Sequence, residues 1–398
     1  MLKKTPKQKT IFFAAGSGDI GKTFDYWLEG KDDPQITSKT YSGQFYSVCR
    51  ELGFKGVAIA YNPSTYDRTE EGIRVRHIPK PKLPQRGALY HIREILYGLR
   101  IIYEAIKAKA DYVVIVDGTT HWFLLYTLTL MGKKIIPSFF CVLWAEAHPF
   151  TGIKRTLLTW DVNFIKKKPL DILVVSKEVQ VQIEKIAKQK VPCTLFFCNY
   201  KRDLFAGMSL KEKANRPTKV LYVGRIETSK GVFDLIKLAE NFKNKGKEIV
   251  FDVCGTGSQL DNLKKAVHEK ELSPFVNILG HCNHSEIKKR FNDTDIVIVP
   301  TRSDFAEGFN QVVTEGILSR RPVVTSSACN ALSLLREACV EVPVNDVAAY
   351  EVAILDLQNN DNLYREKVRA CDALQEHFYN ENLGWKAQLL AIVRKAEK

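Results

Sequence analysis

DIVIVPTRSDFAEGFNQVVTEGILSRRPVVT, residues 295–325, contains two predicted strands with a glycine turn and a helix between them. The apolar run Ile296–Val299 is short, rich in β-branched residues and followed by a proline, which is typical of a buried parallel strand. A polar loop leads to Glu307-Gly308-Phe309-Asn310, and residues 311–319 are predicted to form a helix. Residues 322–325 are the second strand. This order predicts a strand-loop-helix-strand unit of an α/β sheet.

The glycine turn in this stretch directs backbone N–H groups into a helix N-terminus, which can hold an anion without a charged side chain. Glu307 and Glu315 flank that turn and cannot be phosphate ligands. Carboxylates in such a place are suited to accept hydrogen bonds from sugar hydroxyls. The predicted ligand is therefore anionic in the middle and rich in hydroxyls at both ends, as a nucleotide-sugar is.

A second loop, GRIETSKG at residues 224–231, follows a predicted strand and opens a helix. Arg225 can bind phosphate oxygens with two hydrogen bonds, and Lys230 adds a point charge. Both would neutralise negative charge that develops on a departing diphosphate. Basic loops at strand ends are common, so this loop is informative together with Glu307 and Glu315 rather than alone.

These motifs together resemble the signature of family-4 retaining glycosyltransferases. The resemblance implies the GT-B fold, an α/β architecture of two facing doubly wound domains. It also implies transfer of a sugar from a nucleotide-sugar donor to an acceptor hydroxyl, in the assembly of a glycan, polysaccharide or glycolipid. Retention is expected without a covalent enzyme intermediate, and no metal or other cofactor is expected to be required.

The resemblance also assigns roles to individual residues. Arg225, Lys230 and the backbone of residues 308–310 would hold the diphosphate, Glu307 the sugar and Glu315 the ribose. A histidine at a strand end near the acceptor is expected, and His148 is the candidate, with Glu146 able to share its role. The predicted catalytic residues are His148, Arg225, Lys230 and Glu307. The predicted donor-binding residues are Gly16, Gly18, Gly224, Gly255, His281, Cys282, Gly308, Phe309, Asn310 and Glu315.

Two positions depart from the family pattern. Asn310 stands where a second glycine is common, which could change the sugar pocket. Arg320 stands where a glycine would take a positive φ after the helix. His121 is a second strand-end histidine, for which a structural hydrogen bond is the better interpretation.

Alternating strand and helix patterns run along the whole chain. They predict an acceptor-side domain at residues 1–200 and a nucleotide-sugar domain at residues 201–380. By resemblance, a last helix at residues 381–398 would cross back to the first domain. One long helix near residue 100 carries an apolar stripe, which we interpret as core. Its members are Ile92, Ile95, Leu96, Leu99, Ile102, Tyr103 and Ile106.

The stretch GSGDIGKT at residues 16–23 matches the P-loop pattern and follows a strand, so a P-loop ATPase or GTPase is the main alternative. Lys22 would then contact phosphates, and Thr23 would contact magnesium. Gly30 and Pro34 would end the following helix within about two turns, which weighs against this alternative. An inactive relative that only binds nucleotide-sugars is a third possibility.

The net charge of the 398-residue chain is +14, and it is unevenly distributed. Residues 1–200 hold 30 Lys+Arg and 18 Asp+Glu, whereas residues 201–398 hold 29 and 27. The excess of +12 in the first half predicts an anionic partner there. We expect a lipid-linked or glycan acceptor and an anionic membrane surface rather than nucleic acid. A solvated basic surface without a partner is the alternative.

The nine cysteines lack paired spacing, and the longest apolar stretch is too short to span a bilayer. No signal peptide pattern is visible in the first residues. These features predict a cytoplasmic protein that is peripheral at the inner face of the membrane. The donor sugar and base, the acceptor, the linkage and the oligomeric state stay open.

Overall fold

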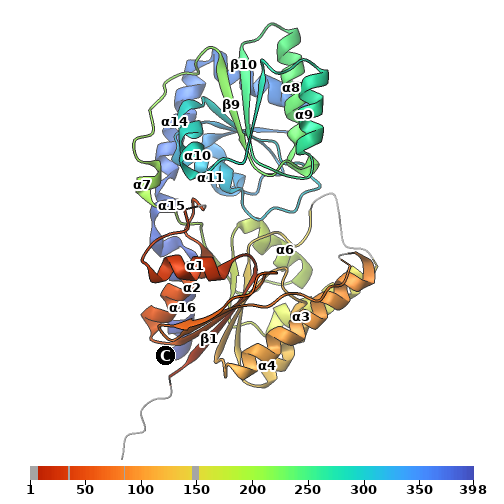
Figure 1. Ribbon diagram of the computed structural model, residues 1–398, viewed down its shortest axis with the longest axis vertical. Helices are drawn as coiled ribbons and strands as arrows, with labels where there is room; N and C mark the ends of the chain where they lie inside the picture. The colour runs from red at the N-terminus through yellow and green to blue at the C-terminus, as the bar shows by residue number, and fades with distance from the viewer. Residues whose placement is uncertain (1–7, 35, 85, 146–151) are drawn as a thin grey trace, which may run out of the picture. The chain divides into compact units, whose positions relative to one another are not determined.

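The computed structural model describes residues 8–34, 36–84, 86–145 and 152–398, which fold into two compact units (Figure 1). The first unit contains the described residues up to Leu143, residues 152–199 and Glu381–Lys398. The second unit contains Tyr200–Asn380 together with Trp144 and Ala145. Each unit is built on a mainly parallel sheet with helices around it, so the predicted α/β class is confirmed.

The sheet of the first unit has the strand order β3-β4-β2-β1-β5-β6-β7-β8, and its pairs are parallel apart from β3 with β4. Residues 11–14 of the central strand β1 are almost fully buried because neighbouring strands and helices cover them on all sides. The strands are β1 (Thr10–Ser17), β2 (Lys55–Tyr61), β3 (Asp67–Glu70), β4 (Ile73–His77), β5 (Tyr112–Val116), β6 (Lys134–Phe139), β7 (Ile172–Val174) and β8 (Cys193–Leu195).

The helices of the first unit include the C-terminal one. Trp385 of α16 is completely buried, and its indole N–H donates to Ser138 Oγ at 2.9 Å. Figure 1 shows α16 beside α2 in this unit. The helices are α1 (Ile20–Leu28), α2 (Tyr41–Leu52), α3 (Gly87–Lys107), η1 (Trp122–Leu125), α4 (Tyr126–Leu130), α5 (Ile153–Lys167), α6 (Lys177–Ala187), η4 (Glu381–Leu383) and α16 (Trp385–Glu397).

The sheet of the second unit has the order β11-β10-β9-β12-β13-β14, and all its pairs are parallel. All its strands therefore end at the same edge. The strands are β9 (Thr218–Val223), β10 (Ile249–Cys254), β11 (Val276–Gly280), β12 (Ile296–Val299), β13 (Val323–Ser326) and β14 (Cys339–Val342). The helices are α7 (Arg202–Phe205), η2 (Thr228–Lys230), α8 (Val232–Asn244), α9 (Leu260–Glu269), α10 (His284–Asp293), α11 (Gln311–Leu318), α12 (Leu332–Leu335), η3 (Arg336–Ala338), α13 (Val347–Asn359), α14 (Asp361–Leu374) and α15 (Glu376–Tyr379).

Helix α11 packs closely on the sheet because Gly316 has no side chain. A Cβ at that position would lie 3.0 Å from Val323 Cγ2 and 3.3 Å from Val297 Cγ2. The helix ends one residue earlier than predicted, and Arg320 takes a left-handed φ of 55° in the connection to β13. The arginine therefore adopts the conformation for which a glycine would be usual.

The predicted burial of the α3 stripe is wrong for most of its members. Ile102 is buried and Ile95 is partly covered, but the other five side chains are exposed. The sheet-facing side of α3 is a different one, formed by residues such as Tyr97, Gly98, Ile101 and Ala105. Within the part of the chain that the structure describes, no helix is long and apolar enough to cross a membrane.

Candidate functional site

Glycines bring the loops after β9, β10 and β12 into backbone contact in the second unit. Gly231 has φ of +76°, and a Cβ there would lie 2.1 Å from the carbonyl oxygen of Pro300. Gly255 has φ of +146°, and a Cβ there would lie 1.8 Å from the carbonyl oxygen of Gly224. Any larger residue at either position would push these loops apart. The sequence thus places the GRIETSKG loop directly against the loop that carries Glu307.

Lys230 and Glu307 meet at this point, although 77 positions separate them in the chain. Lys230 Nζ donates to Glu307 Oε1 at 2.8 Å, and the two side chains are only 14% and 18% exposed. Phe305 covers the ammonium group, with its ring centroid 3.8 Å from Nζ. The exposed Arg225 guanidinium lies 5.3 Å from the same ring. We call Arg225, Lys230, Phe305, Glu307 and Asn310 the Lys230 cluster.

Asn310 holds the second oxygen of Glu307. Its Nδ2 donates to Glu307 Oε2, which also accepts from Thr301 Oγ1 at 3.3 Å. Asn330 Nδ2 donates to the backbone oxygen of Glu307. The asparagine that replaces the family's common glycine is thus a buried partner of Glu307 rather than a gap in the site. Its side chain fixes the direction in which the carboxylate points.

The N-terminus of α11 lies directly after this loop. Asn310 is the N-cap residue, but its side chain makes no capping hydrogen bond, because it is bonded to Glu307. A first turn without a side-chain cap leaves its N–H groups suited to an anion. Glu315 is buried further along α11. The structure thus brings Arg225, Lys230, Glu307 and the Gly308–Asn310 turn together, at the sheet edge where this anion-binding end points.

The remaining predicted residues of the second unit lie at the ends of neighbouring strands. The backbone N–H of Gly255 donates to the carbonyl oxygen of Gly280 at 2.7 Å, which joins the loops after β10 and β11. Cys282 Sγ lies 3.7 Å from the same carbonyl oxygen, and His281 beside it is exposed. His281 and Cys282 therefore stand at the outer end of the row of strand ends. Their contact with a nucleotide base stays a prediction.

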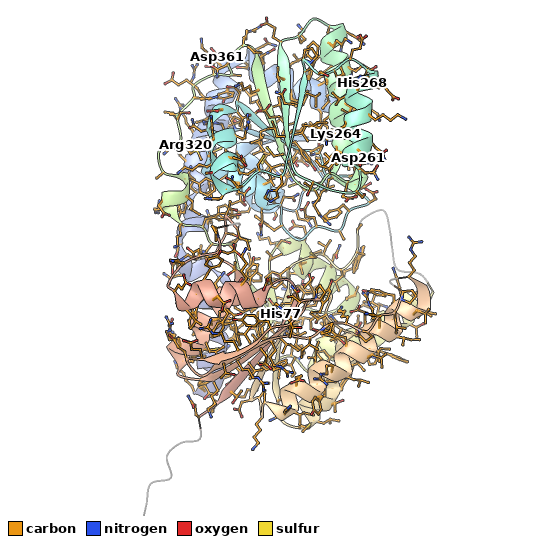
Figure 2. All side chains as sticks on the ribbon, in the orientation of Figure 1. His77, Asp261, Lys264, His268, Arg320 and Asp361 are labelled. Atoms are coloured by element: carbon orange, nitrogen blue, oxygen red, sulfur yellow. The ribbon has the colours of Figure 1, made fainter. Side chains whose placement is uncertain are left out.

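The P-loop interpretation of residues 16–23 is not favoured, because the helix after it uses its own N–H groups. Asp19 Oδ1 accepts from the backbone N–H of Lys22 at 2.9 Å. His77, labelled in Figure 2, accepts from the N–H of Gly21 at 3.3 Å. Lys22 Nζ lies 5.8 Å from the ring centroid of Tyr26, which belongs to the same helix. A carboxylate thus occupies the place where a P-loop would receive phosphate.

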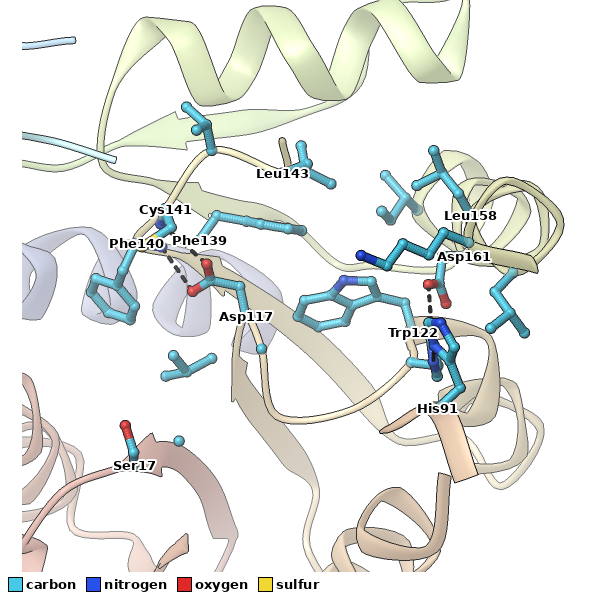
Figure 3. Close-up of a pocket in the computed structure, with 18 of the residues that line it drawn as sticks. Ser17, His91, Asp117, Trp122, Phe139, Phe140, Cys141, Leu143, Leu158 and Asp161 are labelled. Carbon is cyan, nitrogen blue, oxygen red and sulfur yellow. Dashed lines mark hydrogen bonds and ion pairs between the residues drawn. The ribbon is translucent and has the colours of Figure 1, made fainter. Parts of the chain in front are cut away.

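Gly16 borders a pocket of about 670 Å³ in the first unit (Figure 3). Its φ is +80°, and a Cβ there would lie 3.6 Å from Val116 and Thr119 side chains. Gly18, with φ of +137°, does not line this pocket. The walls are largely apolar and aromatic, formed by residues that include Tyr61, Tyr90, Val116, Trp122, Phe139 and Leu157. His148 and Glu146 lie outside the described residues.

Asp117 projects into the same pocket, as Figure 3 shows. Its carboxylate accepts from the backbone N–H groups of Phe140 at 3.0 Å and Cys141 at 3.1 Å. Burial nevertheless raises the pKa of Asp117 to about 6. The side chain thus fixes the loop after β6 and changes its charge in mildly acidic solution.

Three further polar side chains of this pocket form a chain of hydrogen bonds. Asp161 Oδ2 lies 3.2 Å from His121 Nδ1, and His121 Nε2 lies 3.1 Å from His91 Nδ1. Asp161 Oδ1 also accepts from the N–H of Phe123 at 2.9 Å. If Asp161 receives the proton of His121 Nδ1, then His121 Nε2 accepts from His91, and His91 Nε2 becomes a hydrogen-bond acceptor. Burial, followed by the charges of His121 and Lys154, lowers the pKa of His91, which favours this neutral form.

Sequence reasoning gave His121 a structural hydrogen bond, and the contact with Asp161 is such a bond. It missed His91 and Asp161, which lie 30 and 40 positions from His121. The available signal was the strand-end position of His121, since polar groups at strand ends of parallel sheets face ligands.

Comparison with known proteins places this geometry in a family. Residues 209–371 match the family model described as glycosyl transferases group 1. Over 134 residues the chain is 28% identical to alpha-D-kanosaminyltransferase from Streptomyces kanamyceticus, covering 34% of each protein. Over 193 residues it is 24% identical to the amylovoran biosynthesis glycosyltransferase AmsK from Erwinia amylovora, covering 47% of each. The chain thus spans about a third to a half of the length of these curated relatives.

Solved structures resemble the whole chain. Sucrose-phosphate synthase from Thermosynechococcus elongatus aligns with a TM-score of 0.72 at 16% identity, covering 98% of both chains. HepE from Anabaena, solved in complex with UDP, aligns with a TM-score of 0.65 at 12% identity, covering 98% of this chain and 99% of that one. At these identities the likeness concerns the fold. Residues 209–371 therefore belong to the glycosyl transferases group 1 family, and the chain has the GT-B fold that its resemblance to family-4 enzymes predicted.

Proposed function

We propose that this protein is a retaining glycosyltransferase that moves a sugar from a nucleotide-sugar to an acceptor hydroxyl. The observation that carries the proposal is the Lys230 cluster, in which a lysine and an arginine lie beside a glycine turn and a carboxylate. Cationic groups and a helix N-terminus suit a diphosphate, whereas the Glu307 carboxylate suits sugar hydroxyls. HepE, which shares the fold, was solved with UDP, and this supports a uridine nucleotide as one candidate donor.

The chemistry follows from where charge develops. As the sugar–phosphate bond breaks, negative charge accumulates on the leaving diphosphate, and Lys230 and Arg225 stabilise it. Glu307 accepts hydrogen bonds from the sugar, and Glu315 from the ribose. Lys230 already has one hydrogen bond to Glu307, and its ammonium group has three donors, so it can bind a phosphate oxygen without breaking that pair. No step of this scheme needs a metal ion, and the leaving group is neutralised by side chains and backbone.

The acceptor is assigned to the first unit, and its pocket is the candidate site. Aromatic and aliphatic walls surround the His91–His121–Asp161 chain, so an acceptor with an apolar part and a hydroxyl group would fit both features. AmsK is named for amylovoran biosynthesis, which supports a glycan or lipid-linked glycan as the acceptor class. His91 Nε2 would accept a hydrogen bond from the reacting hydroxyl.

We further propose that the protein attaches to the anionic cytoplasmic face of a membrane. Two basic residues of the first unit do not contribute, because Lys80 is buried against Glu94 at 2.5 Å and Lys9 is bonded to Glu397. Exposed basic side chains remain along the connector before α3 and at both ends of α5. They are Lys82, Arg86, Lys154, Arg155, Lys167 and Lys168. Each such residue contributes about 1 kcal/mol near an anionic surface.

The transferase proposal is tested with a panel of nucleotide-sugars, by thermal shift and by donor hydrolysis without acceptor. Lys230→Ala is expected to lose about 2–4 kcal/mol of transition-state stabilisation, or roughly 30- to 1,000-fold in rate. Lys264→Ala is the matched control, since Lys264 is an exposed residue of α9 in the same unit (Figure 2). Turnover by Lys230→Ala equal to that of the control would refute the donor site.

A further inference from the structure

Helix α3 exposes a straight line of large apolar side chains, which we call the α3 apolar stripe. Its members are between 38% and 52% exposed and follow one another at intervals of three and four residues. They are Leu89, Ile92, Leu96, Leu99, Tyr103 and Ile106. At 1.5 Å per residue the stripe is roughly 25 Å long. Single exposed apolar residues are normal, but a continuous line along one helix marks an interaction surface.

The orientation of α3 is fixed by its opposite face. A Cβ at Gly98 would lie 2.0 Å from Thr120 Oγ1, so the helix packs closely on the loop after β5 at that point. Tyr97 and Ile101 next to this contact are almost fully buried. The helix therefore cannot turn the stripe inward without losing its present core contacts.

The charges on α3 are separated by sign. Its two carboxylates are buried, and they are bonded to basic groups: Glu94 to Lys80 and Glu104 to Arg76 at 2.8 Å. The outward-facing charged residues are basic. Arg100 and Lys107 lie 5.2 and 5.8 Å from the ring centroid of Tyr103. The surface of α3 thus combines apolar side chains, one tyrosine and cations, as helices that lie in a membrane interface do.

We propose that the α3 apolar stripe inserts into the boundary between headgroups and acyl chains of an anionic bilayer. Arg100 and Lys107 then contact lipid phosphates, and Tyr103 lies at headgroup depth. This deepens the membrane attachment proposed above, since it adds an apolar contribution to an electrostatic one and names the element that makes contact. It does not depend on which sugar is transferred.

A second copy of the chain fits this surface less well. The stripe has the three-four spacing of a coiled-coil seam, and Arg93, Arg100 and Lys107 directly follow its members Ile92, Leu99 and Ile106. Those flanking positions normally carry opposite charges on paired helices. Here two copies of α3 would bring cations together without an exposed carboxylate of α3 to neutralise them. A negatively charged lipid surface provides that neutralisation.

The test measures binding of the full chain to vesicles by co-sedimentation. Vesicles of phosphatidylcholine with phosphatidylglycerol are compared with vesicles of phosphatidylcholine alone, at low and at high salt. The wild type is expected to bind the anionic vesicles at low salt and to retain part of this binding at high salt, because apolar insertion is not screened. The double variant Leu96→Ser/Leu99→Ser is expected to bind roughly tenfold more weakly or worse and to retain none at high salt.

A matched control and two independent readouts keep the outcomes distinct. Val181→Ser/Val352→Ser removes two isolated exposed apolar residues, on α6 and α13, and is expected to bind as the wild type does. Hydrolysis of a soluble nucleotide-sugar is expected to be equal in all three proteins, so a failed vesicle test leaves the transferase proposal standing. Equal vesicle affinity of the stripe variant and the wild type overturns the inference. So does a wild-type dimer, seen by light scattering, that the stripe variant converts to monomers, because a second copy then covers the stripe.

Discussion

Replacing Glu307 with glutamine tests how far the Lys230 cluster depends on one carboxylate. Oε1 accepts from Lys230 at 2.8 Å, while Oε2 accepts from Asn310 and from Thr301 at 3.3 Å. Glutamine keeps one acceptor oxygen and puts an NH₂ donor in the other position. Whichever way the amide lies, a donor that was satisfied then faces another donor.

The size of the effect follows from burial. Losing a hydrogen bond to a charged group costs about 1.5–3 kcal/mol, and partial exposure of the pair reduces this. With side chains 14% and 18% exposed, we expect a loss of about 1–3 kcal/mol in the free energy of unfolding of the second unit. For a unit of this size that corresponds to a melting temperature lower by roughly 2–10 °C.

Thermal unfolding and donor turnover are measured on Glu307→Gln and on Glu269→Gln. Glu269 is the matched control, because its side chain is 61% exposed and lies 3.7 Å from Lys265 on the same helix. We expect the Glu307 variant to melt lower and to turn over donor more slowly, and the control to behave as the wild type does. A Glu307 variant with wild-type stability and turnover would refute the assigned role of this carboxylate.

Three further predictions concern the backbone, pH and the P-loop pattern. Arg320 has a positive φ and an exposed ion pair with Asp372, so Arg320→Gly should be about 1 kcal/mol more stable to urea than Arg320→Ala, which loses the same ion pair but keeps the strain. Equal stability of the two variants would show that the backbone is not strained there. The pKa of Asp117 is raised to about 6, so the folded state binds the extra proton, and the stability that this group contributes should fall by roughly 2–3 kcal/mol from pH 4 to pH 6.5. Urea unfolding of Asp117→Asn should lack that part of the pH dependence, and an unchanged profile would contradict the assignment. Hydrolysis of ATP and GTP should be undetectable, and magnesium-dependent turnover abolished by Lys22→Ala would revive the P-loop interpretation.

The sequence predicted the parts of the site that depend on local pattern. Short apolar strands that end in glycine place Gly224 and Gly255 at one sheet edge, and parallel order then brings Arg225 and Glu307 to the same region. The ion pair between Lys230 and Glu307 was not predicted. It depends on how closely two loops approach, and the contact of Gly231 with the Pro300 carbonyl sets that distance.

Other features depend on tertiary contacts that no local pattern reports. The spacing of apolar residues predicted α3 as a helix but placed its covered side wrongly, because Gly98 and the buried carboxylates decide which face meets the sheet. Strand β3 was missed because all four of its residues are exposed. It pairs with β4 through contacts such as Arg74 with Asp67 at 2.8 Å, which a sequence alone does not indicate.

The central claim is that this chain transfers a sugar with retention, using side chains and backbone in place of a metal. It is tested most directly by proton NMR of the sugar first released or transferred from an α-linked UDP-sugar, in the presence of a chelator. We predict UDP release at an undiminished rate and a product that is initially the α-anomer, with both signals lost in Lys230→Ala. An initial β-anomer, or a reaction that stops when the chelator is added, would contradict the account.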